Sequence, residues 1–207
     1  MILNKQIITT TKMSTIIILN GTSSSGKTSI RHEFQKLTKD FYYDFSMDNL
    51  YGLFPAKYVN FKDKPLTKYH KLGIYFDAKT KTTKKGEYGI KFMNDMPYVI
   101  KTLADRDTNI IGDLVLTELE RIKTLVKPIR DHQTYLVRTV CSIENLRIRE
   151  KQRGDRKIGL AENQLPRIDT KYNDLVLESN NKTPKQLAKE LISFIKNNKP
   201  QALKKLQ

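Results

Sequence analysis

The hydrophobic positions of this chain fall into short runs separated by longer segments with helical spacing. The short runs are rich in Ile, Val, Leu and Tyr and predict strands at 16–19, 42–46, 109–113, 134–141 and 175–177. Apolar residues three or four positions apart predict helices over 29–39, 95–104, 119–129 and 183–195. Strands that alternate with helices form a parallel sheet covered on both faces. The pattern predicts an α/β fold: a three-layer, doubly wound, parallel five-stranded sheet.

One segment interrupts this alternation between the second and third strands. Residues 49–71 are irregular and aromatic-rich and contain two prolines. Over 72–92, two stretches of alternating apolar residues flank a run of lysine and threonine at 79–86, which predicts a hairpin with that run as its solvated tip. We interpret 49–92 as an inserted hairpin region on the substrate side of the domain. Asp95 and Pro97 are expected to open the helix that follows.

A loop rich in glycine and serine separates the first strand from the first helix. It has the pattern Gly-x-x-x-x-Gly-Lys-Thr in the strand-loop-helix setting of a phosphate-binding loop (P-loop). Its amides can turn toward an anion, Lys27 can reach the β- and γ-phosphates and act in catalysis, and Thr28 can hold Mg²⁺. We expect a nucleoside triphosphate to be bound by Gly21, Thr22, Ser23, Ser24, Ser25, Gly26, Lys27, Thr28 and Ser29.

Two aspartates follow predicted strands, at the edge where parallel α/β sheets bind ligands. Asp48 follows the second strand and can accept a proton from a hydroxyl that attacks the γ-phosphate. The alternative is a helix cap for the turn that begins at Asn49. Asp113 ends the third strand and fits a Walker-B-like carboxylate, which with Thr28 would orient Mg²⁺. A cap for the next helix explains Asp113 nearly as well.

A group of arginines follows the fourth strand. Arg149, Arg153 and Arg156 have the i, i+4, i+7 spacing that places side chains in one stripe on a continuous helix, and Gly154 gives the segment a place to bend. A stripe that closes over the phosphates would neutralise charge and exclude water. We therefore interpret 147–165 as a lid-like segment, with Arg149 and Arg153 as catalytic residues and Arg153 and Arg156 as nucleotide contacts. A solvated helix face is the alternative.

Composition narrows the class of protein. At 207 residues one domain is favoured, and 38 Lys and Arg against 22 Asp and Glu give a net charge of +16. A solvated basic surface explains this excess; a nucleic-acid partner is not favoured because the basic residues are spread along the chain. A single cysteine, Cys141, excludes an internal disulfide and fits a reducing cytoplasm. Apolar runs far shorter than ~20 residues argue against a membrane span.

Four motifs occur in order along most of the chain. They are Ile17 to Thr28, Asp48 with Phe54-Pro55, Gly112 to Val115, and Arg147-x-Arg149-Glu150-x-x-Arg153-Gly154-Asp155-Arg156-x-x-Gly159-Leu160-Ala161-x-x-Gln164. This set resembles the chloramphenicol phosphotransferase-like family of P-loop kinases. The resemblance implies a kinase-type P-loop NTPase fold, ATP and Mg²⁺ as cofactors, and a small-molecule hydroxyl as acceptor. It also implies Asp48 as general base, Lys27 and Thr28 as nucleotide and Mg²⁺ contacts, and the arginines as lid or phosphate-site residues.

The leading hypothesis is therefore an ATP-dependent phosphotransferase that phosphorylates a small molecule. We expect an N-terminal extension at 1–13, the kinase domain at 14–198 and a basic tail at 199–207, with no signal for an oligomeric state. The charge motivates one alternative, a polynucleotide or nucleotide-sugar kinase. Gly112, where the family often has a second acid, motivates another: a nucleotide-binding regulatory or toxin-like protein without transfer activity.

Overall fold

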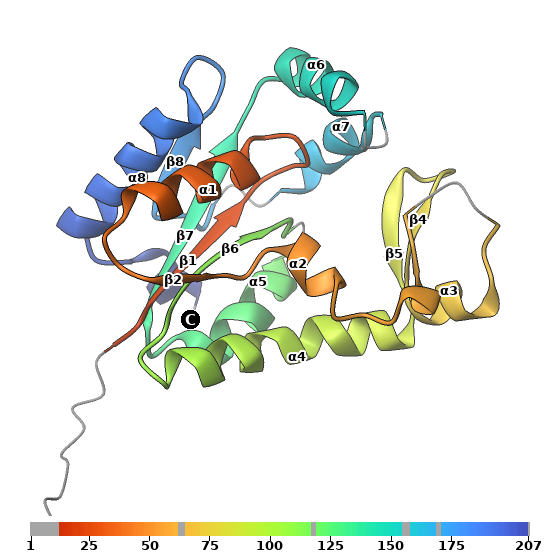
Figure 1. Cartoon of the computed structure of the whole chain (residues 1–207), viewed down its shortest axis with the longest axis horizontal. Coiled ribbons are helices and arrows are strands. Elements are labelled where there is room, and N and C mark those ends of the chain that lie inside the picture. The colour runs from red at the N-terminus through yellow and green to blue at the C-terminus, as the bar shows by residue number, and fades with distance from the viewer. Residues whose placement is uncertain (1–12, 62–64, 117–118, 155–157, 169–170, 207) are drawn as a thin grey trace, which may run out of the picture.

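The computed structural model describes residues 13–61, 65–116, 119–154, 158–168 and 171–206. Within them, five parallel strands form one sheet in the order β2-β6-β1-β7-β8 (Figure 1). These strands are β1 (Thr15–Asn20), β2 (Tyr42–Asp44), β6 (Asn109–Leu114), β7 (Gln133–Val140) and β8 (Leu175–Glu178). The predicted five-stranded parallel sheet is confirmed. Except for Met13, the proposed N-terminal extension lies outside the described residues.

Helices cover both faces of this sheet because its central strands are apolar on both sides. Along β1, Ile16 and Ile18 pack on one face and Ile17 and Leu19 on the other, and none of the four is more than 1% exposed. Helices α4 and α5 cover the first face, and α1 and α8 cover the second (Figure 1). Their bounds are α1 (Lys27–Leu37), α4 (Glu87–Ala104), α5 (Leu119–Val126) and α8 (Pro184–Asn197). The three-layer arrangement follows from the uninterrupted apolar runs.

The carboxyl ends of the strands meet at one edge, where close packing leaves room only for glycine at position 112. Leu19 of β1 lies opposite Asp113 of β6, and the amide of Phe45, just after β2, donates to the carbonyl of Ile111 at 2.9 Å. A Cβ atom on Gly112 would lie 2.7 Å from the Phe45 carbonyl oxygen. A side chain at position 112 has no room, which explains why Asp113 is not preceded by a second acid.

The excursion between β2 and β6 forms a second, small sheet. Its strands are β3 (Val59–Asn60), β4 (Ile74–Asp77) and β5 (Thr82–Lys85), with β4 parallel to β3 and antiparallel to β5. The remaining elements of the excursion are α2 (Met47–Tyr51), the 3₁₀ helix η1 (Ala56–Tyr58) and α3 (Lys68–Leu72). The hairpin prediction is correct for its first strand and wrong for its second, because the lysine and threonine run itself forms β5.

The residues expected to form that second strand belong to α4 instead. This helix begins at Glu87, so the expectation that Asp95 and Pro97 open it is also wrong. Its start is held by the amide of Gly86, which donates to the Gly73 carbonyl at 2.8 Å. Its buried positions follow a helical period: Gly89, Met96, Pro97, Ile100 and Ala104. Burial of this face outweighs the local alternation of Tyr88, Ile90 and Phe92.

The chain ends against the main core. The 3₁₀ helix η4 (Ala202–Leu206) buries Ala202, and the amides of Gln201 and Ala202 donate to Asp174 Oδ1 at 2.5 and 2.8 Å. Much of the segment expected to be a basic tail is therefore folded. The other elements are α6 (Ile143–Arg153), α7 (Leu160–Gln164), η2 (Lys127–Ile129) and η3 (Leu165–Arg167). In the part of the chain described, no helix has the length and apolarity needed to cross a bilayer.

Candidate active site

A cavity of about 1070 Å³ opens at the carboxyl edge of the main sheet. Its lining comes from the loop after β1, the start of α1, α2, β5, the middle of α4 and the α6–α7 segment. In Figure 1, α6 and α7 lie on one side of this region and the small sheet lies on the other. This edge is where parallel α/β sheets bind ligands, and the cavity joins the predicted P-loop to the inserted segment.

The P-loop leaves the start of α1 open. Gly26 has a φ of 98°, a left-handed conformation that favours glycine, and no side chain of the described residues caps the helix. The helices that do have a side-chain cap are α2, α3, α6 and α8, capped by Ser46, Thr67, Ser142 and Thr183. Uncapped amides at a helix N-terminus attract anions, so the loop is suited to a phosphate group.

Two buried hydroxyl groups test whether the loop fits a nucleotide. Ser24, with a φ of 60°, and the fully buried Ser25 carry Oγ atoms that have no hydrogen-bond partner among the described residues. Buried polar groups without a partner are rare in folded proteins because they cost stability. Ser24 lines the cavity, so a phosphate oxygen there would satisfy its hydroxyl, and in this respect the loop fits a nucleotide. Ser25 does not line the cavity.

Lys27 is folded back over the loop. Its Nζ donates to the carbonyls of Gly21 and Thr22 at 2.9 and 2.6 Å, and the residue is buried. Gly21 itself is confined, because a Cβ there would lie 2.6 Å from the Thr139 carbonyl oxygen. The loop thus holds the Lys27 side chain at the cavity that it lines.

The predicted metal residues lie together. Thr28 Oγ1 donates to Asp113 Oδ2 at 3.1 Å, and Asp113 is 7% exposed. The carboxylate bonds to α1 at the P-loop, which supports the Walker-B-like interpretation over a cap for the following helix. A hydroxyl and a carboxylate are oxygen ligands of the kind that Mg²⁺ prefers.

Arg31 completes this cluster and was not predicted from the sequence. Its Nη1 contacts Asp113 Oδ2 at 2.5 Å and its Nε lies 3.1 Å from Asp44 Oδ1, while its side chain is only 4% exposed. Arg31 is four residues after Lys27, so the i, i+4 spacing that places two side chains on one helix face could have identified it.

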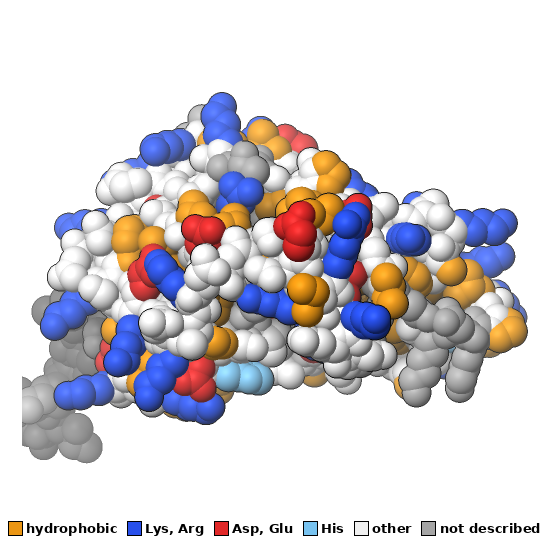
Figure 2. Space-filling view, turned by 90° about the horizontal axis from the view of Figure 1, so that it is seen from above, with side chains coloured by type: hydrophobic (Ala, Val, Ile, Leu, Met, Phe, Trp, Pro, Cys, Tyr) orange, Lys and Arg blue, Asp and Glu red, His pale blue; other side chains and the backbone are white. Residues whose placement is uncertain are grey.

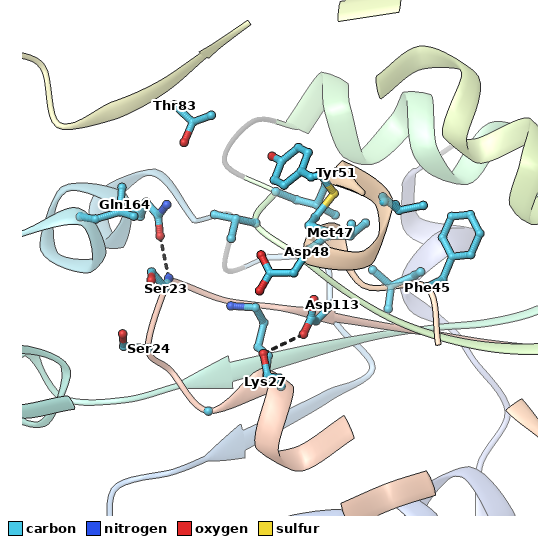
Figure 3. A pocket seen from close by; sticks show the side chains of 18 of the residues that line it. Ser23, Ser24, Lys27, Phe45, Met47, Asp48, Tyr51, Thr83, Asp113 and Gln164 are labelled. Atoms are coloured by element: carbon cyan, nitrogen blue, oxygen red, sulfur yellow. Dashed lines mark hydrogen bonds between the residues drawn. The ribbon is translucent and has the colours of Figure 1, made fainter. Parts of the chain in front are cut away.

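Asp48 lies in the first turn of α2 and lines the cavity. Figure 3 shows its carboxylate directed toward the end of Lys27 and the P-loop. The cap of α2 is Ser46, whose Oγ accepts from the Asn49 amide at 3.2 Å, so the alternative in which Asp48 caps this turn does not describe the structure. The structure therefore brings Asp48, Lys27 and Asp113 to one cavity.

Arg149 is tied to the P-loop through Ser179. Its guanidinium donates to Ser179 Oγ at 2.9 Å and to the Ser179 carbonyl, and that hydroxyl lies 2.9 Å from the Ser25 carbonyl. Arg153 is exposed and lines the cavity. Helix α6 ends at Arg153 because Gly154 is left-handed, with a φ of 68°. The predicted stripe does not continue as one helix to Arg156, which lies outside the described residues.

Helix α7 links α6 to the P-loop. The buried carboxylate of Glu150 accepts from the amides of Gly159 and Ala161 at 2.8 and 2.7 Å. Arg147 bonds Glu162 through two nitrogens at 3.0 and 2.8 Å, which raises the pKa of Arg147 and lowers the pKa of Glu162. These contacts fix the segment that the sequence analysis assigned to a lid.

Gln164 is a second residue of the site that was not predicted from the sequence. Its Oε1 accepts from the amide of Ser23 in the P-loop at 2.7 Å (Figure 3). It belongs to the arginine-rich motif described above. Because it lies 141 residues from Ser23 in the sequence, no local pattern relates the two residues.

Solved structures show the same fold at low sequence identity. An APS kinase from Mycobacterium tuberculosis, in complex with AMPPNP and APS, superposes with a TM-score of 0.61 at 16% identity, over 89% of this chain and 99% of that one. The tunicamycin resistance protein of Deinococcus radiodurans gives 0.60 at 12%, over 91% and 99%. A shikimate kinase from Acinetobacter baumannii gives 0.56 at 12%, over 91% and 96%.

Sequence comparison adds the family. No curated protein matches the chain. The family of chloramphenicol phosphotransferase-like proteins matches residues 14–196, which include every element of the main sheet. Because that match spans most of the chain and coincides with the P-loop fold, the chain belongs to the chloramphenicol phosphotransferase-like family and is a nucleotide-dependent P-loop kinase.

Proposed function

We propose that this protein transfers the γ-phosphate of ATP, bound with Mg²⁺, to a hydroxyl group of a small molecule. One observation carries the proposal: Asp48 and Lys27 come from different elements and point toward each other in a single cavity (Figure 3). A carboxylate beside the phosphate-binding lysine is placed to meet an acceptor hydroxyl where the γ-phosphate ends.

The donor side of the proposal uses the P-loop. The amides at the start of α1, the hydroxyl of Ser24, and Lys27 would hold the phosphates. Thr28 and Asp113 would hold Mg²⁺, which when bound neutralises charge on the phosphates. Arg149 and Arg153 would face the same charge from α6, and Arg149 is already oriented by Ser179.

The acceptor side uses Asp48. As the acceptor oxygen forms its bond to the γ-phosphorus, Asp48 takes the hydroxyl proton and the bond to the ADP oxygen breaks, with its electrons leaving on ADP. Apolar side chains beyond Asp48, including Leu50, Tyr51, Met96 and Ile100, line the rest of the cavity. Such a wall would exclude water from the reacting phosphate and favour transfer over hydrolysis.

The positive charge supports a second candidate, a polynucleotide kinase. Figure 2 shows Lys and Arg side chains scattered over one face of the molecule, with Asp and Glu among them. A polynucleotide acceptor would favour a continuous basic track. On this face the basic side chains are interrupted by acidic ones, so we prefer a small-molecule acceptor. Binding to a single-stranded oligonucleotide that weakens steeply with salt would reverse this preference.

A metabolite extract incubated with labelled ATP tests the proposal. The wild-type protein should label at least one compound, which mass spectrometry then identifies. Lys27→Ala and Asp48→Asn should each abolish transfer, and Asp48→Asn should keep its affinity for ATP because it changes the acceptor side only. Asp95→Asn, an exposed carboxylate of α4 that pairs with Lys91, is the control and should transfer normally.

Two results would overturn the proposal. Full turnover by Asp48→Asn would remove Asp48 as the base. Stabilisation of the wild-type protein by ATP and Mg²⁺, with no labelled product from the extract or from a broad panel of alcohols, would favour the nucleotide-binding protein without transfer activity.

A further inference from the structure

The lysine-rich run that the sequence pattern assigned to a solvated tip borders the active-site cavity. Lys81, Thr83 and Lys85 line it, as does Thr82, whereas Lys84 is exposed and does not. Alternate residues of a strand face the same side, so Thr83 and Lys85 of β5 face the cavity together while Lys84 between them does not. Lys81, in the turn before β5 with a left-handed φ of 50°, adds a second lysine to the lining. Figure 3 shows Thr83 across the cavity from the P-loop residues.

This row is held in place by pairing within the small sheet. Lys85 lies opposite Ile74 and Thr83 lies opposite Phe76 in the antiparallel register of β4 and β5. Ile74 is fully buried, which fixes the register because a shift by one residue would turn its side chain outward. The alternation that sends Lys84 away from the cavity is therefore a fixed property of the fold.

The tip of the hairpin is also fastened to the opposite wall. Asn163 Nδ2 of α7 donates to the Thr80 carbonyl at 3.4 Å, and Lys81 Nζ lies against Gly159, where a Cβ would be 3.1 Å away. Gly159 has a φ of 85°, which already favours glycine. Lys81 thus lies between the inserted sheet and the α6–α7 segment.

Charge in the cavity is unbalanced. Eight lysines and arginines line it, against three acidic residues among those described. Of these acids, Asp113 is bonded to Arg31 and Glu120 is paired with Lys123 at 3.0 Å. Asp48 points toward Lys27 at the P-loop side (Figure 3). The excess of basic over acidic side chains along the cavity wall favours a ligand that brings negative charge of its own, and Lys81 and Lys85 belong to this excess on the hairpin side.

We propose that the phosphoryl acceptor is an anionic alcohol, whose phosphate, sulfate or carboxylate group is bound by Lys81, Thr83 and Lys85. This inference rests on the proposed function and names the class of its acceptor. Ammonium and hydroxyl groups bind oxyanions through charge-assisted hydrogen bonds, and partial enclosure strengthens them. The apolar wall of α2 and α4 would receive the uncharged part of the same molecule, with its hydroxyl at Asp48.

Fractionation of the metabolite extract tests the charge of the acceptor. An anion exchanger at pH 7.5 divides the extract into retained and unretained compounds, and each fraction is incubated with labelled ATP and the full-length protein. Label is expected in a compound from the retained fraction. A product that arises only from the unretained fraction would overturn the inference and leave the kinase intact, whereas no product from either fraction would overturn both.

Matched variants then test the residues, with the acceptor so identified. Lys81→Gln combined with Lys85→Gln should raise the KM for the acceptor about tenfold or more and leave the KM for ATP within about twofold. Lys84→Gln removes the same charge from the other face of β5 and should change neither constant. An unchanged acceptor KM, or a change confined to the KM for ATP, would overturn the inference; melting curves confirm that each variant is folded.

Competition identifies the anionic group. Inorganic phosphate, sulfate and malonate are each added as probes at constant ionic strength, and the one that resembles the group on the acceptor should compete best. Competition should be against the acceptor and should be lost in the double lysine variant. Inhibition that is competitive with ATP alone would place the anion in the P-loop and contradict the inference.

Discussion

Arg31 and Asp113 form a buried ion pair directly behind the P-loop, with Nη1 and Oδ2 2.5 Å apart. The same oxygen accepts from Thr28, and Arg31 also reaches Asp44, so one guanidinium joins α1 to the ends of β2 and β6. The position of Asp113 is therefore set by a residue that does not itself line the cavity.

Arg31→Met should destabilise the protein strongly. It would leave two carboxylates near each other without their common partner, and removing one member of a buried pair costs about 3–5 kcal/mol. Chemical denaturation measures the loss. Lys36→Met is the control because Lys36 lies on the same helix and pairs with Glu33 at the surface, a pair worth about 0.5 kcal/mol.

Arg31→Lys separates positioning from stability. The lysine keeps the charge but cannot bridge two carboxylates as a planar guanidinium does. We expect a loss of about 2 kcal/mol and a higher Mg²⁺ concentration for half-maximal binding of a fluorescent ATP analogue. Binding in EDTA should change little. A Mg²⁺ titration identical to the wild type would show that Arg31 does not position Asp113.

Gly112→Ala should destabilise the protein by about 1–3 kcal/mol, as overpacking does. The new Cβ would meet the Phe45 carbonyl oxygen at 2.7 Å, and a backbone atom cannot move aside cheaply. Thermal melting measures the effect. Gly52→Ala is the comparison, since Gly52 has an ordinary helical φ of −64° and should lose less than about 1 kcal/mol. Equal losses would contradict the packing argument.

The main sheet was predictable because its strands coincide with short runs rich in Ile, Val, Leu and Tyr, such as 16–19, which are separated by segments with helical spacing. The inserted segment was not, because Tyr88, Ile90 and Phe92 fit a strand period locally while the buried residues of α4 follow a helical one. The polar run 82–85 has no apolar pattern of its own, and its strand becomes evident only from its antiparallel pairing with β4, which contains the buried Ile74.

The same reasoning applies to the site. The P-loop is contiguous, so its pattern identifies it, and Asp48 and Asp113 follow strand ends whose position is known from topology. Contacts such as Gln164 with Ser23, or Arg31 with Asp44, join segments that no local pattern relates. The run of lysine and threonine at 79–86 was assigned to solvent because runs of charged residues are usually solvated. Only the folded hairpin shows that Lys81, Thr83 and Lys85 line the cavity.

Glu150→Gln should loosen α7. The carboxylate accepts from two amides at 2.8 and 2.7 Å, and a carboxamide would present an N–H₂ group to one of them. We expect a loss of about 1–3 kcal/mol and faster hydrogen exchange over 159–164. Glu144→Gln, on the exposed side of the same helix, should change exchange there very little. Unchanged exchange in Glu150→Gln would mean that other contacts hold α7.

The buried phenol of Tyr42 should cause the stability of the protein to fall at alkaline pH. Burial raises the pKa of its phenol to about 12, above the ordinary value of 10. Between these values the unfolded chain loses the proton while the folded protein keeps it, so the unfolded state binds fewer protons and stability falls as pH rises from 10 toward 12. Urea melts at pH 9 and 11 measure this fall. Tyr42→Phe should lose about 1 kcal/mol less than the wild type over that interval, whereas Tyr43→Phe, an exposed neighbour, should behave as the wild type. Equal losses in the two variants would show that burial of Tyr42 does not govern the alkaline limit.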